Sequence, residues 1–267
     1  ARTAGRGRAL QTAAALAGMH DDSALALVYA TEAAGILREL GNTRDLAQVL
    51  VFLGAATNDL AAFAEAEALV RASGDPFGIG MQQFVQGEVA LDRGDYDEAR
   101  RRYTESLAMF RKIDGDSPLH SAPLLGLGRI ASVEKDYVQA RAFVEEALAM
   151  RRKDTENRFA IAIALNSLGE VDRCEGLASQ ATPLFEEALR YGREFDDSPL
   201  ISWSLHNLGH VALGAGDLPT AAARFHESLT LRRRGGPHFN LASSVAAFPR
   251  PAPRIQAVAA AARRLRA

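Results

Sequence analysis

The sequence predicts an all-α protein, a solenoid of about six antiparallel helical hairpins. Two observations predict this fold class. Gly87, Gly128, Gly169 and Gly209 recur at a spacing of about 40 residues, and the residues that follow each glycine repeat in type at fixed offsets. Repeats of this length are typical of helical units that bury their apolar faces against their neighbours in the chain.

Each glycine marks a predicted first helix, and the residues after it predict a second helix. Alanine, a large apolar residue and leucine follow each glycine after twelve, sixteen and twenty residues. Steps of four residues keep these side chains on one helix face. A glycine and an alanine allow two antiparallel helices to approach closely, while the larger residue fills the groove beside them. The alanines are Ala99, Ala140, Ala181 and Ala221, and the larger residues are Tyr103, Val144, Phe185 and Phe225.

Turn signals separate the predicted helices. Gly94 and Gly216 supply a residue that tolerates left-handed backbone at the end of a first helix, and the aspartate after each is the predicted N-cap of the second. Asp116–Pro118 and Asp197–Pro199 precede the next hairpins. In both segments we expect serine as the N-cap and proline at the first helical position.

The hairpins are expected over six spans, which together form one domain at 1–234. The first two are weaker copies of the pattern: Gly18 is followed by Leu27, and Gly54 by Phe63 and Ala66. The spans are 8–40, 42–74, 77–113, 116–153, 155–194 and 198–234.

Residues 235–267 depart from the pattern. Pro249, Pro251 and Pro253 fall where the next leucine-glycine pair would come, and proline ends a helix. This segment is expected to be a degenerate seventh repeat, a capping helix or a mobile tail.

Leu168-Gly169 and Leu208-Gly209, together with the repeated alanines and aromatics, resemble the tetratricopeptide repeat (TPR). That family pattern covers about 34 residues, so the longer unit here places extra residues in the helices and connections. The resemblance implies a right-handed superhelix with a concave groove lined by the first helix of each hairpin. It also implies a module that binds a protein or peptide and catalyses no reaction.

The resemblance further implies which first-helix residues face the groove. The candidate partner-binding residues are Arg129, Asn166, Glu170, Arg173, Trp203, His206, Asn207 and His210. Side-chain amides and an aromatic anchor suit an extended peptide. Solvated helix surface explains each single polar position equally well. Replacing the two asparagines, Arg173 and His206 together by alanine is expected to abolish binding and to leave helicity unchanged.

Composition excludes several other functions. The formal charge of −2 and the pI near 6.4 lack the excess of lysine and arginine that binding to phosphate backbones needs, so no direct contact with nucleic acid is expected. No apolar run approaches the roughly 20 residues of a membrane helix. Cys174 is the only cysteine and cannot form an internal disulfide, which fits a cytoplasmic location.

No cofactor or catalytic motif is found. His206 and His210 lie one helical turn apart, a spacing used for zinc, but a further ligand would have to come from another hairpin, such as Glu170, and no metal is expected. Cys174 has no nearby histidine base and is expected to be structural. Favourable interaction with the helix dipole explains the arginines near the ends of the second helices, and contact with acidic partners is the alternative. These arginine groups lie at 100–102, 151–153 and 232–234.

The expected role is the sensor or interaction arm of a larger bacterial transcriptional regulator. Long repeats rich in Ala, Leu and Arg and nearly free of lysine resemble the repeat regions of multidomain signalling ATPases related to the maltose-regulon activator. Such an arm would bind an inhibitory protein or a small-molecule inducer. The start at Ala1 favours a piece of a longer chain, although removal of an initiator methionine would look similar. The alternatives are a stand-alone adaptor that recognises a peptide and a hydrolase with an unrecognised site.

Overall fold

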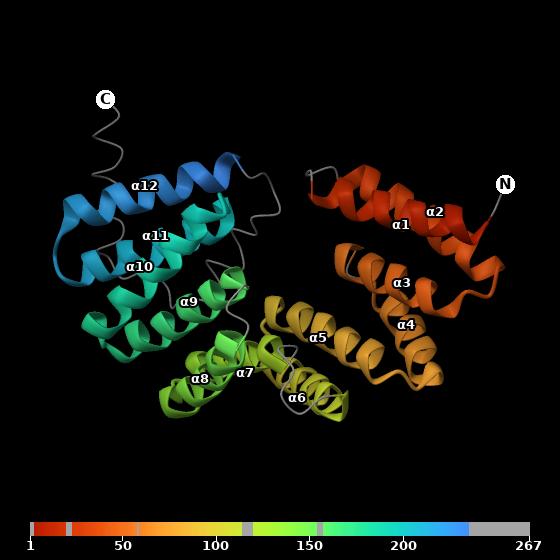
Figure 1. Cartoon of the computed structure of the whole chain (residues 1–267), viewed down its shortest axis with the longest axis horizontal. Helices are drawn as coiled ribbons and strands as arrows, with labels where there is room; N and C mark the ends of the chain where they lie inside the picture. Colours follow the sequence, from red (N-terminus) through yellow and green to blue (C-terminus); the bar gives the residue numbers. More distant parts are fainter. Residues whose placement is uncertain (1–2, 20–22, 58, 114–119, 154–156, 235–267) are drawn as a thin grey trace. The chain divides into compact units, whose positions relative to one another are not determined.

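The computed structural model describes residues 3–19, 23–57, 59–113, 120–153 and 157–234, and within these ranges it contains α-helices and no strand. Consecutive helices pack together as hairpins (Figure 1), which confirms the predicted all-α hairpin fold. The expected forms of 235–267 and the expected caps at 116–118 lie outside the described residues. The helices are α1 (Ala4–Met19), α2 (Ser23–Glu39), α3 (Thr43–Thr57), α4 (Leu60–Ser73), α5 (Pro76–Asp92), α6 (Tyr96–Ile113), α7 (Ser121–Val133), α8 (Tyr137–Lys153), α9 (Arg158–Glu175), α10 (Ala178–Glu194), α11 (Ser198–Gly214) and α12 (Leu218–Arg234).

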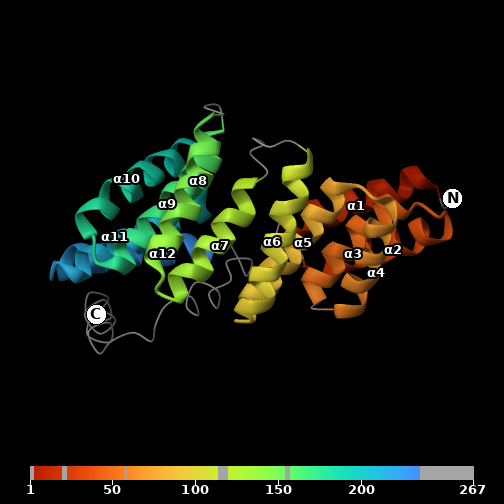
Figure 2. The same cartoon turned by 90° about the horizontal axis from the view of Figure 1, so that it is seen from below.

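The hairpins divide into two compact units, Ala1–Ser117 and Pro118–Ala267. In the first unit, α2 packs against α3 and α4 against α5, and the first helices α3 and α5 also touch (Figure 2). In the second unit, α8 packs against α9 and α10 against α11. There the first helices α7, α9 and α11 contact one another in sequence order, so one face of this unit is built from first helices.

The repeated glycines allow the close helix contact that the sequence predicted. A Cβ atom added at Gly169 would lie 2.6 Å from the Phe185 ring, and one added at Gly87 would lie 2.7 Å from the Tyr103 ring. The four repeated alanines are all 0% exposed. The glycine row and the alanine row are therefore closely packed positions of the hairpins.

The turns inside hairpins follow the prediction. Gly94 and Gly216 have φ angles of 78° and 81°. The Asp95 carboxylate accepts a hydrogen bond from the Glu98 amide at 3.1 Å, and Asp217 accepts one from the Thr220 amide at 3.1 Å. Each aspartate thus satisfies an amide that the helix start leaves without an intrahelical partner.

The expected serine cap of α11 is wrong. Asp197 is the N-cap, and its carboxylate accepts a hydrogen bond from the Leu200 amide at 2.7 Å. Asp197 has the extended backbone that a cap requires, whereas Ser198 is already helical. Pro199 still falls in the first turn, where its missing amide removes no helical hydrogen bond.

Two arginines near the ends of second helices are buried, which corrects the explanation by the helix dipole alone. Arg151 and Arg232 are 8% and 7% exposed. Arg151 Nε donates to Ser121 Oγ at 2.8 Å, and Arg232 Nε donates to Ser202 Oγ at 2.8 Å. Burial lowers the pKa of Arg151 to about 10. Each arginine therefore connects the end of a second helix to the first helix of the same hairpin by a hydrogen bond.

Candidate functional site

The predicted partner-binding residues lie on the first helices of the second unit, on α7, α9 and α11. These helices carry a set of partly exposed side chains around the predicted groove positions. We call this set the first-helix face and define it as Arg129, Ile163, Glu170, Arg173, Trp203, His206, His210 and Leu213. The face combines apolar, aromatic and charged groups.

A hydrogen-bond network fixes the centre of this face. Trp203 Nε1 donates to Glu170 Oε1 at 2.8 Å, and Asn207 Nδ2 donates to the same oxygen at 3.2 Å. The Asn207 amide also donates to the Trp203 carbonyl at 3.3 Å. Glu170 therefore connects α9 to α11 and holds the indole ring in one orientation.

Asn166 and Asn207 do not present their amides to a partner, contrary to the sequence-based expectation. Both side chains are 0% exposed. Asn166 Nδ2 donates to Ser204 Oγ at 2.9 Å, which joins α9 to α11 in the interior. The variant with all four alanine replacements is therefore also expected to lose stability, because removing buried hydrogen bonds weakens packing. The sequence pattern missed this because adjacent first helices contact each other at the positions just before the glycine.

His206 and His210 form a pair of neutral rings. Their Nε2 atoms are 3.2 Å apart, and both rings meet Phe225 edge to face, with centroid distances of 5.5 and 5.1 Å. Burial, with smaller effects of His210 and of the charges of Arg232 and Arg173, lowers the pKa of His206 to about 3. Burial, with a smaller effect of the charge of Arg173, lowers the pKa of His210 to about 4. At neutral pH one ring can therefore donate to the other.

The described residues offer this pair no further metal ligand. Within the described ranges, no three side chains of His, Cys, Asp or Glu group closely enough to hold a metal ion. Glu170, the third ligand that the sequence suggested, accepts hydrogen bonds from Trp203 and Asn207 instead.

Cys174 lies at the surface next to this face. Its side chain is exposed, and its Sγ atom is 3.7 Å from Nη2 of Arg173. Packing in the core therefore does not explain this residue, which corrects the expectation of a structural role.

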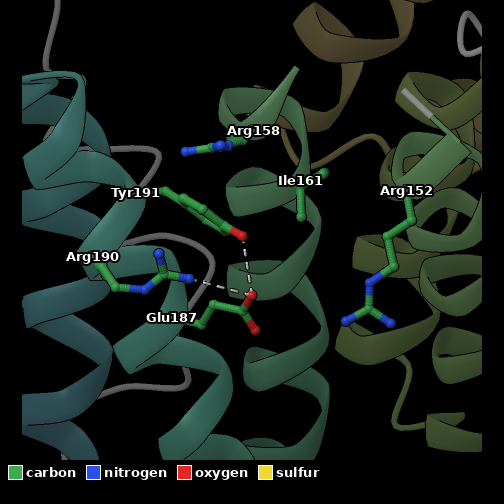
Figure 3. Close-up of a pocket in the computed structure, with 6 residues that line it drawn as sticks. All are labelled: Arg152, Arg158, Ile161, Glu187, Arg190 and Tyr191. Carbon is green, nitrogen blue, oxygen red and sulfur yellow. Dashed lines mark hydrogen bonds and ion pairs between the residues drawn. The ribbon is translucent and has the colours of Figure 1, made fainter. Parts of the chain in front are cut away.

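A separate pocket of about 440 Å³ lies elsewhere in the second unit, and the sequence analysis did not predict it. Helices α8, α9 and α10 supply its walls (Figure 3). Its lining residues are Arg152, Arg158, Ile161, Glu187, Arg190 and Tyr191. The sequence signal for this pocket is Arg152 near the end of α8. The pocket was not predicted because interaction with the helix dipole already explained that arginine.

No described helix combines the length and the apolar character that crossing a membrane requires.

Comparison with known proteins agrees with this architecture. The family model of the tetratricopeptide repeat matches residues 85–153 and 160–234, which together make up more than half of the chain. No curated protein matches the sequence.

Several solved structures are similar to this chain. BtubC (BKLC) from P. vanneervenii is 21% identical with a TM-score of 0.63, over 78% of this chain and 90% of that chain. Two structures of a putative kinesin light chain with nearly identical TPR-like repeats from Podosopora anserina are each 16% identical. The form that carries a point substitution has a TM-score of 0.45 over 78% of this chain and 95% of that chain. The other has a TM-score of 0.43 over 87% and 97%.

Proposed function

Because the chain belongs to the tetratricopeptide repeat family, whose repeats generally mediate binding to proteins or peptides, we propose that it holds an extended segment of a partner protein on its first-helix face. The supporting observation is the ordered Trp203 between Glu170 and Asn207 on that face. Repeat scaffolds of this kind are typically not enzymes, and the proposal requires no cofactor and no catalytic step.

The chemistry of the face suits a peptide with an apolar side chain and an acidic group. Trp203 offers a large, partly exposed ring, and large aromatic side chains dominate the binding energy of many interfaces. Because Glu170 already fixes the ring, binding costs little side-chain entropy. Arg173 and Arg129 add positive charge, whereas the two histidines stay neutral at pH 7. An acidic residue next to the apolar anchor would therefore be favoured.

Selection of binding peptides from a displayed random library tests this proposal. The affinity of a selected peptide is then measured by calorimetry for Trp203→Ala and for Val138→Ala, a matched control on α8 whose side chain is 82% exposed. We expect Trp203→Ala to weaken binding by about tenfold or more, as for a typical anchor residue, and Val138→Ala to leave it unchanged. Equal affinity of both variants for every selected peptide would show that the first-helix face is not the binding site.

A finer proposal places this module as the sensor or interaction arm of a larger bacterial transcriptional regulator. Its support is the long repeat unit and a composition with very little lysine. Such an arm would respond to an inhibitory protein or a small-molecule inducer, whereas a stand-alone adaptor would bind its peptide without further domains. Reading the flanking coding sequence separates the two: an upstream phosphate-binding loop supports the regulator, and a start codon directly before Ala1 supports the adaptor.

A further inference from the structure

Ion pairs between successive second helices recur along the chain. Arg71 on α4 pairs with Glu105 on α6 at 2.5 Å, and Arg193 on α10 pairs with Glu227 on α12 at 3.3 Å. In the repeat numbering, Arg193 occupies position +24 relative to Gly169, and Glu227 occupies position +18 relative to Gly209. In the Arg193–Glu227 pair, position +24 of one hairpin therefore faces position +18 of the next hairpin.

The same register predicts an ion pair between Arg152 and Glu187, and the structure does not form it. Arg152 occupies position +24 relative to Gly128, and Glu187 occupies position +18 relative to Gly169. Glu187 instead accepts a hydrogen bond from the Tyr191 hydroxyl at 3.3 Å and pairs with Arg190 at 3.7 Å. Figure 3 shows Arg152 on the opposite wall of the pocket. Among the described residues Arg152 has no ion-pair partner. The pocket therefore lies between two side chains, Arg152 and Glu187, that the repeat register would pair.

Positive charge dominates the pocket. Among the described lining residues, three guanidinium groups reach it from three different helices, those of Arg152, Arg158 and Arg190, against one carboxylate, that of Glu187. Arg158 also pairs with Glu194 at 2.6 Å, which leaves one net positive charge when that carboxylate is included. A guanidinium group has five N–H donors in a fixed planar arrangement, so each arginine keeps donors available after one ion pair.

We propose that this pocket binds the phosphate group of a small phosphorylated ligand. A carboxylate presents two oxygens in one plane, which suits one or two guanidinium groups. A phosphate presents its oxygens tetrahedrally and can accept hydrogen bonds from donors on three helices at once. Arg152 and Arg190 are the principal donors, with Arg158 at the rim, and the Tyr191 ring and Ile161 contact the organic part of the ligand. This site is independent of the first-helix face.

Calorimetry with inorganic phosphate and pyrophosphate on the full chain tests the site, with sodium chloride holding the ionic strength constant. We expect saturable binding of pyrophosphate that is tighter than that of phosphate, and only weak binding of succinate. Arg152→Gln should raise the pyrophosphate Kd by about tenfold, the usual loss for one charge-assisted hydrogen bond. Glu187→Gln should lower the Kd, because it removes the carboxylate that lines the pocket among the described residues and also the ion pair of Arg190.

Arg193→Gln is the matched control, because Arg193 is an exposed arginine on α10 outside the pocket lining. The pyrophosphate Kd of Arg193→Gln should equal that of the unchanged protein. Circular dichroism should show equal helicity for all variants. Absence of saturable binding, an unchanged Kd in Arg152→Gln, or succinate binding as tight as pyrophosphate binding would overturn the proposal. Trp203 belongs to the first-helix face and does not line this pocket. Peptide affinity should therefore be the same in Arg152→Gln as in the unchanged protein. A failure of the phosphate site can thus be told apart from a failure of the proposed peptide binding.

Discussion

Single buried polar residues connect the first helices of the second unit. Asn166 is fully buried on α9 and donates to Ser204 on α11, while Asn207 and Trp203 both donate to Glu170. These bonds run between successive hairpins, where a nonpolar contact would fix the relative position less strictly. A buried amide is stabilising only while its partner is present, so each of these residues acts as a specific connection between two helices.

Asn166→Ala should destabilise the protein by about 1–3 kcal/mol, because it removes a buried hydrogen bond and leaves a small cavity. The free energy of unfolding is measured by urea denaturation followed by circular dichroism. Gln139→Ala, at an exposed position on α8, is the control and should change the free energy by less than about 0.5 kcal/mol. Equal stability of the two variants would contradict the structural role of Asn166.

The histidine pair should make stability depend on pH in a defined direction. The folded-state pKa values of about 3 and about 4 lie below the ordinary value of about 6.5. Between pH 6.5 and about 4 the unfolded chain binds protons that the folded chain does not bind. The free energy of unfolding should therefore fall as the pH is lowered through this window.

Urea denaturation at pH 7.5, 6.5 and 5.5 measures this effect, above the range in which most carboxylates titrate. A variant with both His206→Gln and His210→Gln should lose less stability between pH 6.5 and 5.5 than the unchanged protein. Parallel pH dependences in the two proteins would show that the pair is not buried as a neutral pair.

At the scale of helices and hairpins, the glycine row determines how closely the two helices of a hairpin pack. At Gly169 an added methyl group would come within 2.6 to 2.9 Å of three ring atoms of Phe185. In contrast, an added Cβ at Gly35 in the interior of α2 has no neighbour within 4 Å. The same substitution should therefore have opposite effects at the two sites.

Gly169→Ala should lower the free energy of unfolding by about 1–3 kcal/mol through overpacking, in spite of the higher helix propensity of alanine. Gly35→Ala should raise it by up to about 1 kcal/mol. Combining Gly169→Ala with Phe185→Leu should cost less than the sum of the two single changes, because the smaller side chain relieves the contact. Urea denaturation of the four variants gives these values, and stabilisation by Gly169→Ala would refute the close contact.

The hairpins could be predicted from the sequence because their packing residues repeat. The glycine, alanine and aromatic rows recur in successive units, so their shared role is visible without a structure. The N-cap at Asp197 was missed because both aspartate and serine cap helices, and only backbone conformation separates them. The burial of Arg151 was missed because it depends on Ser121 of the facing helix, at a position where two other repeats have Gly80 and Ala162.

At the scale of the whole molecule, the fold class follows from local pattern because each hairpin contacts mainly its neighbours in sequence. The binding surface does not follow in the same way. Asn166 shares the polar character of Arg173, yet only Arg173 is partly exposed, because burial at these positions depends on side chains of the adjacent first helix. The absence of an Arg152–Glu187 ion pair likewise cannot be read from the sequence. It requires comparing the pair that the repeat register predicts with the ion pairs that the structure forms. A repeat scaffold fixes the shape and leaves specificity to a few side chains.

Fluorescence of Trp203 during titration with a selected peptide directly tests whether the first-helix face binds the peptide, since this is the only tryptophan of the chain and lies on that face. Binding at the first-helix face should give a saturable change in the emission of Trp203 with the same Kd that calorimetry gives. Titration with pyrophosphate should give no such change. Peptide binding that calorimetry detects while the Trp203 emission stays constant would show that the peptide does not bind at the first-helix face.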